Sequence, residues 1–265
     1  PLYWVLTLLI ANVALAKPDL LASTVFDGSH LLASLFFIPM PHPKLGIEFP
    51  VLIPGWTLNY EMAFYALFAG TLFARHHLRP YLALAALLGV VGAGWAGLPV
   101  PAFYANPIVL EFGFGILVGM AYLKGVRLGP TLSLLLGSLG FVLLIGLEPL
   151  DVSRFLKAGM PSLLIVAACA LKRPAPYRRP ASIPLLLGDS SYSLYLTQAI
   201  SLPAVAKLSV ALGLSATAVG SVAFVAILTF TATLMGIACY KMLEKPLLAR
   251  TTQVSRRPKP SVSSW

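Results

Sequence analysis

The chain has 265 residues, of which 58% are hydrophobic and only 11% are charged, and its mean hydropathy is +0.86. Soluble domains carry about 25% charged residues, so this composition excludes an ordinary soluble protein and predicts an integral membrane protein. In a soluble protein, a net charge of +10 would suggest that nucleic acid is a binding partner. Here the placement of the basic residues has a topological explanation, and no nucleic-acid partner is expected.

Eight apolar stretches are predicted to cross a bilayer: 1–16, 56–73, 80–98, 107–123, 130–147, 157–171, 190–209 and 215–240. Their lengths of roughly 15 to 27 residues favour α-helices over the strands of a barrel, which have about 10 alternating residues. The predicted fold class is therefore all-α, a polytopic transmembrane helical bundle. Residues 1–250 are predicted to form a single domain and residues 251–265 a disordered basic cytoplasmic tail.

The basic residues test this arrangement. If all eight stretches cross, 14 of the 19 Lys and Arg residues fall on one side: Arg75, Arg79, Lys124, Arg127, Lys172, Arg173, Arg178, Arg179, Lys241, Lys245, Arg250, Arg256, Arg257 and Lys259. The other side holds the remaining five: Lys17, Lys44, Arg154, Lys157 and Lys207. The positive-inside rule then makes the first side and the C-terminus cytoplasmic.

Glu61 is the first candidate for function because it lies near the start of the second apolar stretch. A carboxylate at the centre of a membrane helix costs roughly 2.5 to 3.5 kcal/mol, and less near an interface, so it usually faces a polar cavity or a partner. Helical spacing puts Thr57, Glu61 and Tyr65 on one face. Two interpretations stay open, a face that lines a cavity or a hydrogen-bonded pair of Glu61 and Tyr65 that joins helices.

Other polar residues also have two interpretations. Glu111 lies at the outer end of its stretch, where it either stabilises the first helical turn or contacts a substrate. Asp189 is predicted to be the N-cap of the seventh helix. Within that helix Ser191, Tyr195 and Gln198 share a face that either bonds neighbouring helices or lines a solvated tunnel.

Several features are expected to carry no chemistry. Cys169 and Cys239 are far apart in apolar stretches, and the four histidines have no ligand spacing, so neither a disulfide nor a metal site is predicted. His42, in the external connection 17–55, is interpreted as an ordinary loop histidine. The stretch 31–38 in that connection is too short to span and is predicted to be a short helix or a re-entrant hairpin. Gly115 and Gly119 predict close packing of helix backbones.

The chain also carries a set of motifs that is specific in combination. They are Pro1-Leu2-Tyr3-Trp4, Ser34-Leu35-Phe36-Phe37-Ile38-Pro39, Gly55-Trp56-Thr57-Leu58-Asn59-Tyr60-Glu61-Met62-Ala63-Phe64-Tyr65, Glu111-Phe112-Gly113-Phe114-Gly115, Gly188-Asp189-Ser190-Ser191-Tyr192-Ser193-Leu194-Tyr195-Leu196 and Glu244-Lys245-Pro246. Together they resemble the membrane-bound acyltransferase 3 family, and within it the branch that acts on bacterial O-antigens and exopolysaccharides.

The resemblance implies a ten-helix acyltransferase of the bacterial inner membrane with no tightly bound cofactor. It implies transfer of an acyl group, commonly acetyl, from acyl-CoA such as acetyl-CoA to a hydroxyl of a polysaccharide or of its lipid-linked glycan precursor. Eight spans leave two unaccounted for, and the chain starts at Pro1 without Met, so an N-terminal truncation is expected. The residues expected to bind substrate are Trp56, Thr57, Tyr65, Glu111, Ser191, Tyr195 and Gln198.

The catalytic histidine of the family follows an arginine by eleven residues on the first helix, and would lie before Pro1. Glu61 would then have a supporting catalytic role, and this chain alone is expected to be inactive. Gln198 stands where relatives usually have a histidine, and an amide does not shuttle protons near neutral pH. The alternatives are a non-enzymatic transporter of glycans or lipid-linked sugars, with Glu61 as its coupling site, or a component of a polysaccharide-export assembly.

Overall fold

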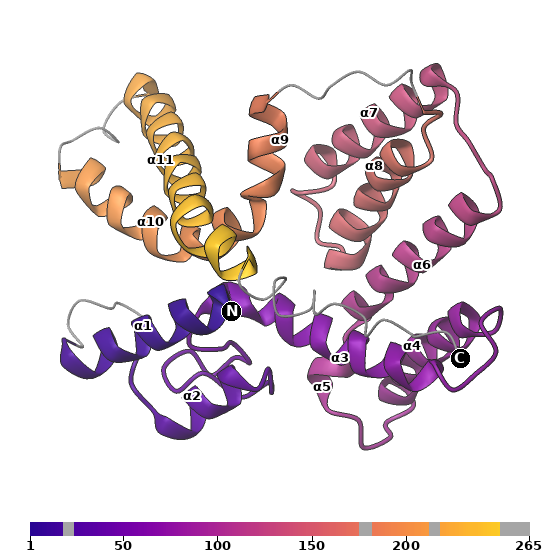
Figure 1. Ribbon diagram of the computed structural model, residues 1–265, viewed down its shortest axis with the longest axis horizontal. Helices are drawn as coiled ribbons and strands as arrows, with labels where there is room; N and C mark the ends of the chain where they lie inside the picture. Colours follow the sequence, from indigo (N-terminus) through magenta and orange to yellow (C-terminus); the bar gives the residue numbers. More distant parts are fainter. Residues whose placement is uncertain (18–23, 175–181, 212–217, 250–265) are drawn as a thin grey trace, which may run out of the picture. The chain divides into compact units, whose positions relative to one another are not determined.

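The computed structural model describes residues 1–17, 24–174, 182–211 and 218–249, and every named element in these ranges is a helix (Figure 1). The all-α prediction is confirmed for this part of the chain. The predicted tail 251–265 lies outside the described residues.

Each of the eight predicted spans contains a helix. They are α1 (Leu2–Ala16), α3 (Trp56–Thr71), α4 (Arg79–Trp95), α6 (Leu110–Leu123), α7 (Pro130–Gly146), α8 (Met160–Ala170), α10 (Ser191–Ala211) and α11 (Ala218–Cys239). Three shorter helices lie between them: α2 (Gly28–Leu35), α5 (Ala102–Ala105) and α9 (Ser182–Asp189). Of these, α2 confirms a short helix in the connection 17–55, whereas α5 and α9 had not been predicted.

The helices differ in how well they match a bilayer. Ser191–Ala211 and Ser221–Ala249 are each long and apolar enough to cross one, and five further apolar helices have 10–17 residues. A helix of 16 residues such as α3 extends roughly 24 Å, compared with about 30 Å for the hydrocarbon core. Two long apolar helices and several shorter ones are the elements of a membrane bundle.

The helices form two compact units, which are described separately. Unit 1 consists of the described parts of Pro1–Asn59 and Arg179–Trp265. Unit 2 consists of the described part of Tyr60–Arg178, which ends at residue 174. Helix α3 contributes its first turn to unit 1 and its remaining turns to unit 2.

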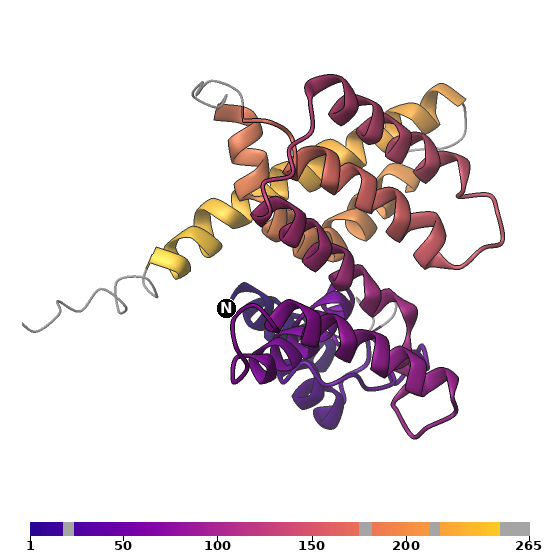
Figure 2. The same cartoon turned by 90° about the vertical axis from the view of Figure 1, so that its right-hand side faces the viewer.

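In unit 1, α10 and α11 pack side by side (Figures 1 and 2). Close packing is possible because Gly236 has no side chain: a Cβ there would lie 2.6 Å from the Cβ of Leu194. The core beside this pair contains Leu2, Leu52 and Leu196, each at most 1% exposed.

The connection between α1 and α3 is anchored on the start of α1. The hydroxyl of Tyr3 donates to the carbonyl of Ser34 at 3.0 Å, and the indole Nε1 of Trp4 donates to the carbonyl of Leu35 at 2.9 Å. These two bonds satisfy carbonyls at the C-terminal end of α2. Phe37, just after α2, has a φ of 58° and its ring stacks on Tyr3 with centroids 5.1 Å apart.

In unit 2, α7 and α8 lie side by side (Figures 1 and 2). A Cβ at Gly140 would lie 2.8 Å from the carbonyl oxygen of Pro161, so glycine is needed at this crossing. The predicted close approach at Gly115 and Gly119 is wrong, because nothing lies within 4 Å of either Cβ position. A repeat of small residues does not show which of them faces a neighbour.

We expect Gly236→Ala to destabilise the α10–α11 pair by about 1–3 kcal/mol, because the new methyl group meets the backbone of Leu194. The measurement is thermal unfolding in detergent. Gly119→Ala is the matched control, since its Cβ enters open space and alanine favours a helix by up to about 1 kcal/mol. Equal melting temperatures for the two variants would contradict the packing described.

Candidate functional site

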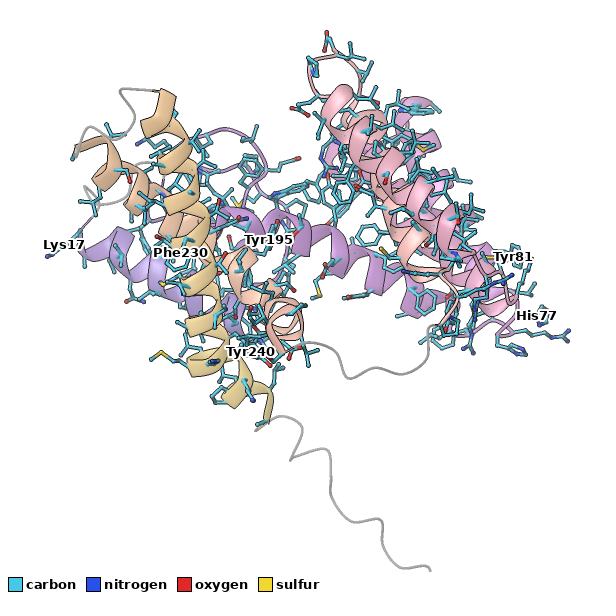
Figure 3. All side chains as sticks on the ribbon, turned by 90° about the horizontal axis from the view of Figure 1, so that it is seen from above. Lys17, His77, Tyr81, Tyr195, Phe230 and Tyr240 are labelled. Carbon is cyan, nitrogen blue, oxygen red and sulfur yellow. The ribbon has the colours of Figure 1, made fainter. Side chains whose placement is uncertain are left out.

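Two of the predicted site residues, Thr57 and Tyr195, meet at the start of α3 in unit 1. The hydroxyl of Tyr195, on α10 (Figure 3), donates to the carbonyl of Pro54 at 2.9 Å and lies 3.1 Å from Oγ1 of Thr57. Thr57 also donates to the same carbonyl, at 3.2 Å. Residues 138 positions apart therefore form one hydrogen-bonded cluster, which fixes α10 to the first turn of α3 beside half-buried Trp56.

One turn further along α3, Glu61 is half-buried in unit 2. Its carboxylate forms no hydrogen bond or ion pair with the described residues, and no hydrogen bond joins it to Tyr65, which is 55% exposed. The opposite side of the helix is packed, since Asn59, which points away from Glu61, is 1% exposed. Glu61 and Tyr65 thus present free polar groups on the open face of α3.

The polar groups of α10 divide between two faces. On the predicted face Ser191 is exposed and Gln198 is half-buried, and neither forms a hydrogen bond within the described chain. The buried hydroxyl groups belong instead to Ser193, Thr197 and Ser201, at intervals of four residues, and to Ser209 two turns further on.

Ser193 has a partner that the sequence analysis missed. Its hydroxyl donates to Oε2 of Glu244, in the π-helical turn η5 (Tyr240–Glu244) that continues α11. The available signal was a carboxylate near the end of the last apolar stretch, in the motif Glu244-Lys245-Pro246. This bond gives Glu244 a structural role at the ends of α10 and α11.

The predicted N-cap at Asp189 is wrong. Asp189 is the last residue of α9, and α10 begins at Ser191, so Ser190 occupies the cap position. The side chain of Asp189 instead interacts with the phenol of Tyr240, which Figure 3 labels. The break between α9 and α10 had not been predicted, and it accounts for the difference.

Two arginines of the predicted cytoplasmic group bind helix ends. Nε and Nη2 of Arg79 donate to the carbonyls of Ala74 and Leu72, each at 3.1 Å, just after α3. Nη1 of Arg127 donates to the carbonyl of Tyr122 at 2.9 Å, at the end of α6. Cations at these positions stabilise the negative ends of the helix dipoles.

Glu111 lies in the first turn of α6, as predicted, and also has a charged partner. Its Oε1 accepts a hydrogen bond from Nη1 of Arg154 at 2.8 Å, with the two side chains 30% and 53% exposed respectively. A pair this exposed contributes at most about 1 kcal/mol to stability. Glu111 borders a cavity of about 200 Å³ between α6 and α8.

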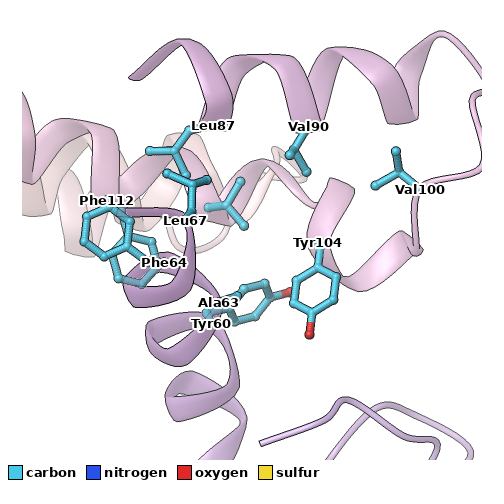
Figure 4. A pocket seen from close by; sticks show the side chains of 10 residues that line it. Tyr60, Ala63, Phe64, Leu67, Leu87, Val90, Val100, Tyr104 and Phe112 are labelled. Atoms are coloured by element: carbon cyan, nitrogen blue, oxygen red, sulfur yellow. The ribbon is translucent and has the colours of Figure 1, made fainter. Parts of the chain in front are cut away.

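A second cavity in unit 2, of about 260 Å³, is lined almost entirely by apolar side chains (Figure 4). Phe64 and Phe112 stack at one end with ring centroids 4.7 Å apart, and Val100 and Tyr104 lie at the other. Such a lining suits hydrocarbon rather than phosphate or sugar.

The connection between α1 and α3 holds two buried histidines, His30 and His42, each 1% exposed. Their rings meet edge to face with centroids 5.1 Å apart. His30 Nε2 lies 2.8 Å from the carbonyl of Phe49, and His42 Nδ1 accepts from the backbone N–H of Lys44 at 3.2 Å. Burial lowers the pKa of His42, and the nearby His30 adds to the effect.

Residues 2–241 match the acyltransferase domain of the acyltransferase 3 family. The chain is also similar to the exopolysaccharide production protein ExoZ of Rhizobium meliloti (strain 1021), with 40% identity over 260 residues, covering 94% of this chain and 78% of ExoZ. No solved structure matches the chain. The match to the domain includes both units and nearly all of the eight predicted spans.

We expect acid to destabilise the connection between α1 and α3 through His42. Its pKa lies below 6.5 in the fold, so the unfolded chain takes up the proton first. The stabilisation is complete above pH 6.5 and is lost as the pH falls below it. His42→Asn keeps an acceptor for the N–H of Lys44 but does not titrate, so its melting temperature should fall less than that of wild type below pH 6.5. An equal fall of the melting temperature in both proteins would show that His42 is not the group responsible for the acid sensitivity.

We expect Tyr195→Phe to lower the thermal stability of the protein in detergent, because the carbonyl of Pro54 and the hydroxyl of Thr57 lose a shared partner. Each such bond contributes about 0.5–1.5 kcal/mol. Tyr81→Phe is the matched control (Figure 3): Tyr81 is 53% exposed and its hydroxyl has no partner among the described residues. Equal loss in both variants would show that the cluster does not hold α3.

Proposed function

The chain belongs to the acyltransferase 3 family, and on that premise we propose that it is an integral membrane O-acyltransferase acting on polysaccharide. It would move an acyl group, in the simplest case acetyl, from acyl-CoA to a hydroxyl of a cell-surface or exported polysaccharide or of its lipid-linked precursor. The similarity to an exopolysaccharide production protein supports a glycan acceptor. Glu61 carries the proposal, because it is a carboxylate on an apolar helix that makes no bond to the described residues.

The distribution of charge supports a location in the bacterial inner membrane with the C-terminus in the cytoplasm. Most of the basic residues then face the compartment that supplies the polyanionic acyl-CoA. The start of α3, with Thr57 and Glu61, lies on the outer half of its span, where a glycan would arrive. The cluster of Tyr195, Thr57 and Pro54 holds that end of α3 in place.

Acyl transfer to an alcohol needs a base for the hydroxyl proton and hydrogen-bond donors for the oxyanion. We assign Glu61 to one of two roles, binding the acceptor hydroxyl or orienting the base that deprotonates it. We assign the phenol of Tyr65 to donating a hydrogen bond to the oxyanion. In unit 1, Ser191 and Gln198 make no bond within the described chain, so we assign both side chains, with Trp56, to substrate binding.

The catalytic histidine implied by the family resemblance is not among the four histidines of the chain, because none follows an arginine by eleven residues. We therefore propose that Glu61 supports the base and that these 265 residues alone do not turn over.

We expect Glu61→Gln in the full-length protein to reduce O-acetylation of the surface polysaccharide by at least about 100-fold, the lower range for loss of an acid–base group. The measurement is NMR of polysaccharide from a deletion strain complemented with wild type or with the variant at equal protein level.

Wild-type acetylation in the variant strain would reduce Glu61 to a packing residue. Loss of surface polysaccharide from the deletion strain, rather than loss of its acetyl groups, would instead favour a transporter or an export component.

A further inference from the structure

The cavity beside Glu111 has a polar rim and an apolar wall. Glu111, Phe114 and Gly115 line it from α6, and Gly159, just before α8, lines it together with Ser162 and Leu163 of α8. All of these residues belong to unit 2. By the charge distribution, the N-terminal ends of α6 and α8 that border this cavity lie on the external side of the membrane.

The backbone is shaped to leave room for the carboxylate. Residues Phe155–Gly159 form a π-helical turn, η4, a wide turn that is frequent at functional sites. Gly159 ends this turn, and a Cβ there would lie 3.1 Å from Oε1 of Glu111. The missing side chain therefore lets Glu111 lie against α8 at the edge of the cavity.

The charges at the rim select the kind of ligand. Oε1 of Glu111 is bound by Arg154, whereas Oε2 forms no hydrogen bond within the described residues. The adjacent guanidinium opposes a cationic ligand, and the carboxylate opposes an anionic one. A neutral hydroxyl both donates and accepts, so neighbouring hydroxyls of a sugar match an acceptor and a donor placed side by side.

The remaining lining suits one sugar ring. Ser162 is exposed and offers a further hydroxyl, which has no partner among the described residues. Phe114 supplies an apolar wall and is supported by Phe155, with ring centroids 5.2 Å apart. A volume of about 200 Å³ holds on the order of seven water molecules at about 30 Å³ each, and a single sugar unit would displace them.

We propose that this cavity binds one neutral sugar unit of the acceptor glycan, with Oε2 of Glu111 accepting a sugar hydroxyl and Arg154 and Ser162 completing the contact. The site is separate from Glu61 and sets how the acceptor is held. The inference depends on the proposed function for its biological role, but sugar binding can be measured without turnover.

The test uses the full-length protein in lipid nanodiscs and, as probe, oligosaccharides from the host's own exopolysaccharide after chemical removal of O-acyl groups. Glu111→Gln removes the charge, and Ser162→Phe fills the cavity from the opposite wall. Each should raise the KM for the oligosaccharide about tenfold or more, and leave the KM for acetyl-CoA within twofold. Glu148→Gln is the matched control, since it changes an exposed carboxylate outside this lining.

An unchanged KM for the oligosaccharide in both variants would overturn the inference, and so would an equal rise in both KM values. If the wild type shows no acetyl transfer at all, the proposed function fails. In that case saturation-transfer NMR tests whether the cavity binds sugar. Oligosaccharide signals that are present with the wild type and disappear with Glu111→Gln and Ser162→Phe support the inference. Signals that persist in both variants, or that are absent with the wild type, overturn it.

Discussion

A polar group placed in an apolar helix needs a partner inside the protein, and this requirement governs the structure. The clearest case is the carbonyl of Pro54, which lies just before α3 and accepts hydrogen bonds from both Tyr195 and Thr57. The same carbonyl also accepts from the backbone N–H of Trp56, and each of the two side-chain bonds adds about 0.5–1.5 kcal/mol to stability. Because Tyr195 is on α10, satisfying this one carbonyl also brings together segments far apart in the sequence, and it sets the position of the first turn of α3.

The same requirement separates three carboxylates that look alike in the sequence. Glu244 accepts a hydrogen bond from the buried hydroxyl of Ser193, and Glu111 shares an oxygen with Arg154. Glu61 has neither kind of partner among the described residues. A half-buried carboxylate that the protein leaves unpaired is stabilised only when another group approaches it. This is why Glu61, rather than Glu244, is assigned to the reaction, and why Glu111 with its one free oxygen is assigned to binding.

The sequence predicted what depends on local pattern. The length of the apolar stretches located a helix in each of the eight predicted spans. The position of Glu111 in the first turn of α6 followed from its place near the start of the stretch 107–123. It did not predict which face of a helix meets a neighbour, because that depends on contacts between distant segments. Gly115 and Gly119 have the spacing of packing residues but face open space, whereas Gly236, at the same spacing from Ala232, meets Leu194. In the same way, the buried hydroxyls of α10 include those of Ser193 and Thr197, which lie on a different face from the predicted stripe of Ser191, Tyr195 and Gln198.

Helical register explains how α6 serves two cavities of opposite character. Val109 and Phe112 line the apolar cavity, while Glu111 and Gly115 line the polar one. At about 100° per residue the mean directions of these two pairs differ by roughly 110°, so they point to adjacent sides of the helix. The register is set where the helix begins: Asn106 accepts a hydrogen bond from the N–H of Ile108 at 3.0 Å and caps the 3-10 turn Pro107–Val109 that leads into α6. A start shifted by one residue would rotate Glu111 toward the apolar cavity, where a carboxylate has no partner. The cap at Asn106 therefore determines which of the two cavities receives the charge.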